Sequence, residues 1–201
     1  MRTRFIGIAL ATLVLIAPAY ADAVFTTGNH PQPNEENILF NSDQMGTTID
    51  AFTNRSGTMV QFSSTTDTLI GTGGQSDVDA MHGLINDIMI MVPGHTFRDL
   101  IINPFKPASN GDLIVMVVTN TGSFMHTYGK TNGNNFLTIT TVGGEVIDSV
   151  TIDSASGFQD LKQPRISGIS GVTIIPEPSS LLMLGSGLIS LAGVLRRKLM
   201  V

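Results

Sequence analysis

The chain has 201 residues, a hydrophobic content of 42%, a charged content of 13% and a formal net charge of -5. This composition is typical of a folded protein, and the absence of cysteine excludes a disulfide framework and a cysteine nucleophile. Between Asp22 and Ile175, six Lys or Arg residues stand against fifteen Asp or Glu residues, which gives this segment a net charge of -9. So acidic a body excludes a nucleic-acid partner, because phosphates need a basic face.

Residues 1–21 have the three parts of a cleavable signal peptide. Two arginines precede an apolar stretch from Phe5 to Ala17, and Ala19 and Ala21 provide the small-x-small pattern that signal peptidase recognises. The alternative is an uncleaved anchor, for which the apolar stretch is short. We therefore expect signal peptidase to cut after Ala21 and the exported chain to begin at Asp22.

Residues 22–175 read as one all-β domain, an antiparallel, jelly-roll-like β-sandwich. Short runs rich in Val, Ile, Phe and Thr are separated by turn residues, which is the pattern of such a fold. The predicted strands are 37–40, 47–53, 58–63, 68–70, 75–81, 84–92, 96–103, 112–119, 135–142, 145–152 and 163–174.

Three details of this pattern lead to specific expectations. Gly143-Gly144 predicts a two-residue hairpin, because both positions can take positive φ. The run Leu113–Val118 is apolar at every position, which predicts a central strand covered on both faces. Apolar residues between Val78 and Val92 also fit a helical face, so a helix there is an alternative, and residues 22–36 are expected to form an extended arm or edge.

The end of this domain resembles the last strands of jelly-roll sandwiches found in exported proteins of bacteria that make exopolysaccharide. The resemblance rests on Asn135–Val142, Ser149–Asp153 and Asp160–Ile169. Because these are strand patterns, they imply a fold rather than an activity.

The sequence contains few candidates for catalysis or metal binding. It has no G-x-S-x-G or H-E-x-x-H motif, so a hydrolase is the less favoured reading and we expect no enzyme. Asp77 and Asp79 lie two residues apart and would share one face of a strand, where two carboxylates suggest a Ca²⁺ site. The alternative is a solvated strand face, since Ca²⁺ takes six to eight oxygen ligands; no other cofactor is expected.

Sugar recognition is the natural alternative for an exported sandwich. Tyr128 is the one tyrosine after the signal peptide, and it lies in an expected loop from Ser123 to Gly133. There His126 and Tyr128, with Lys130 and Asn132 beside them, suggest a polar and aromatic binding rim. An ordinary solvated loop is the competing interpretation.

Residues 176–201 have three ordered parts. Pro176, Glu177 and Pro178 keep the backbone extended, and Leu181–Leu195 is apolar or small throughout. A helix of that length spans about 22 Å, short of a hydrocarbon core of about 30 Å. The basic cluster that follows would hold the C-terminal side of this transmembrane helix in the cytoplasm; it consists of Arg196, Arg197 and Lys198.

This arrangement resembles the PEP-CTERM sorting signal of Gram-negative bacteria. The resemblance implies that an exosortase, an integral membrane processing enzyme, cuts at or near the Pro-Glu-Pro motif and passes the protein to the outer envelope or the exterior. A plain single-pass anchor is the alternative. We thus expect an exported cell-surface or extracellular-matrix protein, held transiently in the inner membrane, with a structural or interaction role associated with exopolysaccharide; a carbohydrate-binding module is the alternative.

Overall fold

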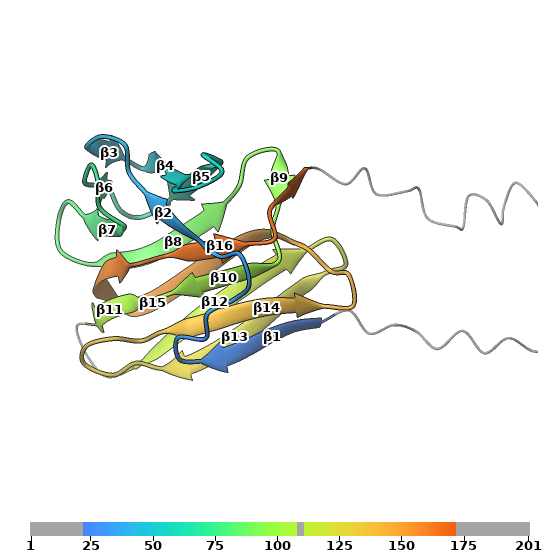
Figure 1. Ribbon diagram of the computed structural model, residues 1–201. Helices are drawn as coiled ribbons and strands as arrows, with labels where there is room; N and C mark the ends of the chain where they lie inside the picture. Colours follow the sequence, from blue (N-terminus) through green and yellow to red (C-terminus); the bar gives the residue numbers. More distant parts are fainter. Residues whose placement is uncertain (1–21, 108–110, 172–201) are drawn as a thin grey trace, which may run out of the picture.

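The structure, a computed structural model, describes residues 22–107 and 111–171, and every regular element in them is a β-strand (Figure 1). All strand pairs are antiparallel. The first layer has the strand order β1 (Asp22–Thr27), β14 (Leu137–Val142), β10 (Asp99–Ile102), β16 (Arg165–Ser167) and β2 (Glu36–Leu39). The second layer has the order β13 (Ser123–Gly129), β12 (Asp112–Thr119), β15 (Ile147–Lys162), β8 (Ile85–Met91), β5 (Met59–Ser63) and β4 (Thr48–Thr53).

The two layers are parts of one curled sheet, because β2 pairs with both β16 and β4. The far half of β15 also pairs with β11 (Pro104–Pro107) and with β7 (Asp77–Ala80), and β7 leads on to β6 (Leu69–Gly71) and β3 (Gln44–Gly46). A separate pair joins β9 (His95–Thr96) to β17 (Ser170–Gly171). The antiparallel sandwich predicted from the strand pattern is confirmed; the predicted terminal helices lie outside the described residues.

One hydrophobic core fills the space between the layers. Residues with no exposed surface come from both sides, such as Leu100 and Ile139 in the first layer and Val115, Ile152 and Ile88 in the second. Those of the second layer alternate along their strands with more exposed residues, as a period of two requires, whereas in the first layer the neighbouring Ile101 and Thr138 are buried as well. Burial of these side chains therefore fixes which face of each strand points into the core.

The structure corrects three sequence-based expectations. Val78–Val92 contains the strands β7 and β8, so the helical alternative is wrong. Leu113–Val118 is central but covered on one face only, because Ile114 on the outer face is 39% exposed. Ser123–Gly129 is the strand β13 rather than a loop, because all seven of its residues pair with or lie against β12.

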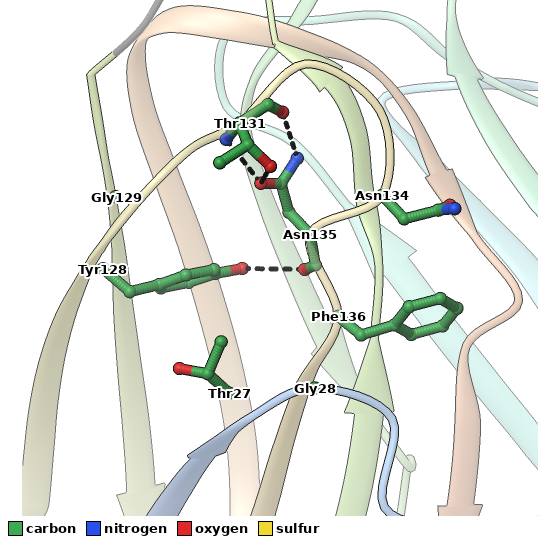
Figure 2. A pocket seen from close by; sticks show the side chains of 8 residues that line it. All are labelled: Thr27, Gly28, Tyr128, Gly129, Thr131, Asn134, Asn135 and Phe136. Atoms are coloured by element: carbon green, nitrogen blue, oxygen red, sulfur yellow. Dashed lines mark hydrogen bonds between the residues drawn. The ribbon is translucent and has the colours of Figure 1, made fainter.

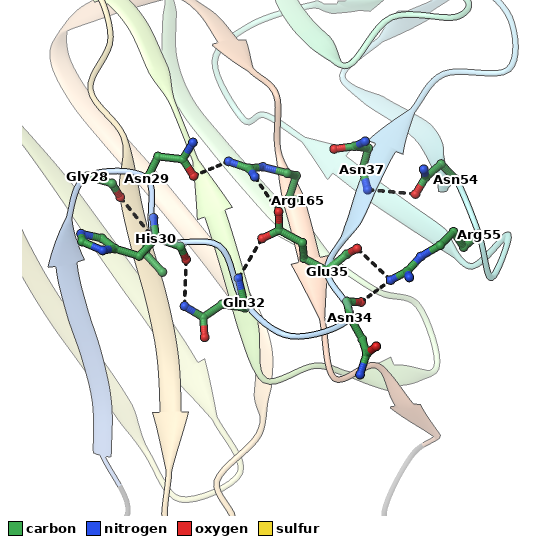
Figure 3. A network of polar contacts seen from close by, with 11 residues as sticks. Gly28, Asn29, His30, Gln32, Asn34, Glu35, Asn37, Asn54, Arg55 and Arg165 are labelled. Carbon is green, nitrogen blue, oxygen red and sulfur yellow. Dashed lines mark hydrogen bonds and ion pairs between the residues drawn. The ribbon is translucent and has the colours of Figure 1, made fainter.

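The expected two-residue hairpin at Gly143-Gly144 is wrong. Both residues have positive φ, 68° and 87°, as expected, but β14 pairs with β1 and β10 whereas β15 pairs with β12 and β8, so the turn links the first layer to the second. The expected edge in residues 22–36 is confirmed. β1 is an edge strand, as expected for part of the arm 22–36, and it pairs along its whole length with β14. The rest of that arm crosses the first layer, where Glu35 forms an ion pair of 2.6 Å with Arg165 of β16 (Figure 3).

The network in Figure 3 fixes this crossing segment. The Glu35 carboxylate also accepts the backbone N–H of Gln32 at 2.9 Å, while Arg55 donates to the backbone oxygens of Asn34 and Glu35 at 2.6 and 2.8 Å. A hollow of about 360 Å³ lies beside Arg165. The guanidinium of Arg165 already donates hydrogen bonds to Glu35 and Asn29, so this polar network holds the arm in place.

A test of this packing uses the glycine at the end of β6. A Cβ at Gly71 would lie 2.4 Å from the ring of Phe40, which is only 2% exposed. We predict that Gly71→Ala lowers the free energy of unfolding by about 1–3 kcal/mol, measured by chemical denaturation. Gly129→Ala is the matched control, because nothing lies within 4 Å of its Cβ position; equal losses in both variants would contradict the packing described.

Candidate functional site

An aromatic row lies along the seam between the edge strands β1 and β13. Phe124, His126 and Tyr128 point inward from β13, and Met125 and Thr127 point outward. The His126 ring stacks on Tyr128 with centroids 5.9 Å apart, and on Phe25 of β1 with centroids 4.8 Å apart. The two residues singled out from the sequence, His126 and Tyr128, are thus neighbours within a seam that joins the two layers.

A hollow of about 230 Å³ opens at one end of this seam (Figure 2). In Figure 2 the ring of Tyr128 points toward Asn135, the ring of Phe136 lies on the other side of the connection that carries both Asn135 and Phe136, and the end of β1 lies below. Its lining residues come from the end of β1, the end of β13 and the connection before β14: Thr27, Gly28, Tyr128, Gly129, Thr131, Asn134, Asn135 and Phe136. His126 is not part of the lining.

The rim of the hollow is held by Asn135, which is 7% exposed. Its side-chain nitrogen donates to the carbonyl oxygens of Pro104 and Thr131 at 3.0 and 2.9 Å, and its side-chain oxygen accepts the N–H of Thr131 at 2.7 Å. Its backbone N–H donates to the side chain of Asn103 at 2.8 Å. These bonds make the connection 130–136 a preformed wall rather than a loose loop.

Tyr128 presents its ring to the hollow more than its hydroxyl. The residue is 8% exposed, and its hydroxyl donates a long hydrogen bond of 3.4 Å to the carbonyl of Asn135. Burial raises the pKa of this hydroxyl, so it stays protonated at physiological pH. It serves as a neutral, apolar surface with a weakly engaged polar tip.

Lys130 does not contribute to a binding rim. It is 5% exposed, and its ammonium donates to the hydroxyl of Ser154 at 2.8 Å and to that of Ser156. Burial lowers its pKa, although the charge of Asp112 opposes the shift. Lys130 therefore ties the end of β13 to the irregular middle of β15, whereas Asn132 is exposed.

Asp77 and Asp79 share one face of β7, as expected, and each faces a charged residue of β15. Asp79 faces Asp160 of β15 in the strand register, and Asp77 faces Lys162, with 3.7 Å between the ammonium and the carboxylate. Burial, together with the hydrogen bond and the negative charge of Asp160, raises the pKa of Asp79 to about 7. In the described part of the chain, no group of three or more His, Cys, Asp or Glu residues is placed to hold a metal ion.

A further pair of carboxylates, not anticipated from the sequence, lies on the outer face of the second layer. Asp87 of β8 faces Asp153 of β15 in the register. Burial alone would raise the pKa of Asp87, but hydrogen bonds from Thr66, Thr65 and Ser64 outweigh it and lower that pKa to about 2. Burial and the charge of Asp87 raise the pKa of Asp153. Asp87 thus organises the turn that follows β5.

The residues predicted for export and sorting lie outside the described part of the chain. They are Ala19, Ala21, Pro176, Glu177, Pro178, Arg196, Arg197 and Lys198. In residues 22–107 and 111–171, the structure contains no helix long and apolar enough to cross a membrane.

The raised pKa of Asp79 predicts a pH-dependent stability. The folded state binds this proton more tightly than the unfolded state does, so stability falls as pH rises from about 4, the ordinary value, to about 7. Asp79→Asn should therefore leave stability nearly unchanged at pH 4 and raise the free energy of unfolding by about 1–2 kcal/mol at pH 8, allowing for solvent screening of a partly buried group. Denaturant melts at both pH values test this, with exposed Asp148→Asn as the control of equal charge change; a gain independent of pH would contradict it.

Comparison with known proteins connects the C-terminal segment to a defined signal. The family profile described as the PEP-CTERM protein-sorting motif matches residues 175–198. This motif implies processing by an exosortase, a membrane enzyme. The corresponding search of curated proteins finds no match.

Among solved structures, the chain is similar to family 29 carbohydrate binding modules. One mutant module shares 12% identity at a TM-score of 0.23, over 74% of this chain and 90% of that chain. A mutant of CBM29-2 shares 12% identity at a TM-score of 0.24, over 79% of this chain and 99% of that chain. Values this low carry no argument about what the present chain binds.

The match at the C-terminal segment is specific, and it agrees with the order of Pro-Glu-Pro, apolar stretch and basic cluster in the sequence. Residues 175–198 are therefore a PEP-CTERM protein-sorting motif, and the chain is an exported protein of the class that bears this signal.

Proposed function

We propose that this protein is a non-enzymatic interaction protein of the outer envelope or extracellular matrix, and that it contacts exopolysaccharide through the hollow that Tyr128 and Phe136 help to line. Residues 22–175 are the body that remains, and residues 176–201 are the sorting signal that an exosortase removes. The observation that carries the proposal is the hollow itself, which combines two aromatic rings with hydroxyl and amide groups on a preformed wall.

The chemistry of the lining suits a sugar ring. A pyranose has an apolar face that packs against an aromatic ring and hydroxyls that need polar partners at its edge. Here Tyr128 and Phe136 supply the rings, and Thr27, Thr131 and Asn134 supply exposed hydroxyl and amide groups. At about 230 Å³ the hollow is smaller than a typical small-molecule pocket of about 300–1,000 Å³, so it suits one residue of a longer chain.

The position of the hollow supports access to an external polymer. The described chain starts at Asp22 in β1 and stops at Gly171 in β17, and both points lie at the same end of the sandwich (Figure 1). The hollow lies at the opposite end of β1, next to Thr27, roughly 17 Å away along the strand. While the C-terminal segment is in the inner membrane, the hollow would therefore face away from the bilayer.

The same proposal includes removal of residues 1–21 by signal peptidase. A cut after Ala21 would leave β1 whole, because Asp22 is its first residue and pairs with Val142. Six residues of edge strand would then begin directly at the new N-terminus.

A purely structural role in the matrix is the second candidate. It is favoured by the burial of Tyr128, whose ring also serves the packing of the seam with His126 and Phe25. In that case the hollow would be a packing imperfection at the end of the sandwich.

Binding measurements separate the two candidates. We predict that protein recovered from the envelope or the medium binds a subset of polysaccharides saturably on a glycan array and in affinity electrophoresis. Phe136→Ala should weaken binding about tenfold, since an aromatic contact contributes up to about 1.5 kcal/mol. Tyr128→Phe should retain most of it, because the ring remains.

The control is Met125→Ala on the outward face of β13, where the side chain is 69% exposed and away from the hollow. It should bind like the unmodified protein. An array without saturable binding, or equal binding by Phe136→Ala and Met125→Ala, would leave the structural role as the better account.

A further inference from the structure

Glu145 is a buried carboxylate at the end of the sandwich opposite the hollow. It follows Gly144 in the turn between β14 and β15, and it is 1% exposed. One carboxylate oxygen, Oε1, accepts hydrogen bonds from the hydroxyls of Thr119, the last residue of β12, and Thr121, in the turn between β12 and β13. The other, Oε2, has no hydrogen-bond partner, and among the described residues it is the one buried side-chain polar atom of this kind.

The carboxylate also lacks a protein counter-charge. In the described part of the chain, the ion pairs of Lys162 and Arg165 are made with Asp77, Asp160 and Glu35, and none involves Glu145. An unpaired buried charge costs several kcal/mol, because the group loses its hydration without compensation. A cation beside Oε2 would remove this cost.

The groups around Glu145 are oxygen donors that a cation can use. The two turns are held together by hydrogen bonds in both directions between Asn120 and Val146, with lengths of 3.2 and 3.0 Å. The carbonyl oxygen of Gly122 lies 3.0 Å from the hydroxyl oxygen of Thr119, so it belongs to the same group of atoms. Asn120, Thr121 and Gly122 are exposed, which leaves an entry path and room for water ligands.

We propose that Glu145, with Thr121 and the adjoining turn 119–122, binds a calcium ion that pairs with the unsatisfied Oε2. Carboxylate, hydroxyl and carbonyl oxygens are hard ligands, which suit Ca²⁺ rather than zinc or copper. Because water must complete the six to eight oxygens, the affinity falls in the range of extracellular modules, with Kd of about 10⁻⁴–10⁻³ M. A site with a Kd in this range responds to the calcium concentrations at which extracellular modules bind the ion.

This site differs from the pair Asp77 and Asp79 suggested by the sequence. That pair has the ammonium of Lys162 beside it, 3.7 Å from Asp77 and 3.4 Å from Asp160, so a cation there would have to displace this ammonium. At Glu145 the ion replaces a missing partner. Its effect would be to hold the turn after β12, in the second layer, against the turn between β14 and β15, which joins the two layers.

Calcium-dependent thermal unfolding tests the proposal on protein recovered from the envelope or the medium. With 5 mM CaCl₂ in place of EDTA, we expect Tm to rise by about 3–5 °C, as follows from a Kd near 0.5 mM for a domain of this size. Calorimetric titration should give one site per chain. Glu145→Gln should abolish both the rise in Tm and the binding isotherm, and Asp79→Asn, the matched loss of one carboxylate, should keep both.

Thr121→Ala provides a second variant. Thr121 is exposed, so the fold should tolerate the change, and we expect the Kd for Ca²⁺ to be about fivefold weaker. An unchanged Tm in CaCl₂, a full calcium effect in Glu145→Gln, or its loss in Asp79→Asn would each overturn the assignment. The same shift with 5 mM MgCl₂ would also overturn it, since the effect would then be one of ionic strength.

Discussion

The structure depends on the burial of the inner face of β15 between the two layers. This strand pairs with β12 and β8 along its first half and with β11 and β7 along its second half. Its residues Val150, Ile152, Phe158 and Leu161 have no exposed surface, and burying each such side chain contributes about 1.5–3 kcal/mol. The register shifts between Asp153 and Phe158, where Gly157 has a φ of 71° and a Cβ would lie 2.6 Å from Leu84. One long strand with this irregularity therefore pairs with β12 and β8 in the middle of the second layer and, further along, with β7, which carries Asp79.

Strands with a clear alternation were predictable because the period of two is local. The boundaries of Asp112–Thr119 agree with β12. Gly143-Gly144 is the expected turn with positive φ, but a local turn signal does not record that the strands on either side join different layers. β13 was missed although Phe124, His126 and Tyr128 alternate with outward residues, because polar and glycine neighbours made the segment look like a loop. The length of β15 was underestimated, since a serine-rich bulge interrupts its apolar pattern. Exposure of Ile114 was also missed, because an apolar sequence does not record which face of a sheet is left uncovered.

The candidate site was only partly accessible to the same reasoning, because it is assembled from distant segments. Tyr128 was identifiable as the one tyrosine of the exported part, but its partners across the hollow come from β1 and from the connection before β14. The same holds for Asp79, whose pKa depends on Asp160 of β15, and for Glu145, whose hydroxyl donors lie in another turn. By contrast, the sorting motif at 175–198 is contiguous, so sequence alone identified it.

Together these features describe a protein in which the sorting motif and the folded β-domain are separate parts of the chain. The chain enters and leaves the sandwich at one end, and the aromatic hollow lies at the other. The claim on which this account rests is that the C-terminal segment is temporary, and the intact mass of the protein recovered from the envelope or the medium tests it most directly. The account predicts a chain that begins at Asp22 and ends near Pro178. A mature protein that still carries Arg196, Arg197 and Lys198 would contradict it.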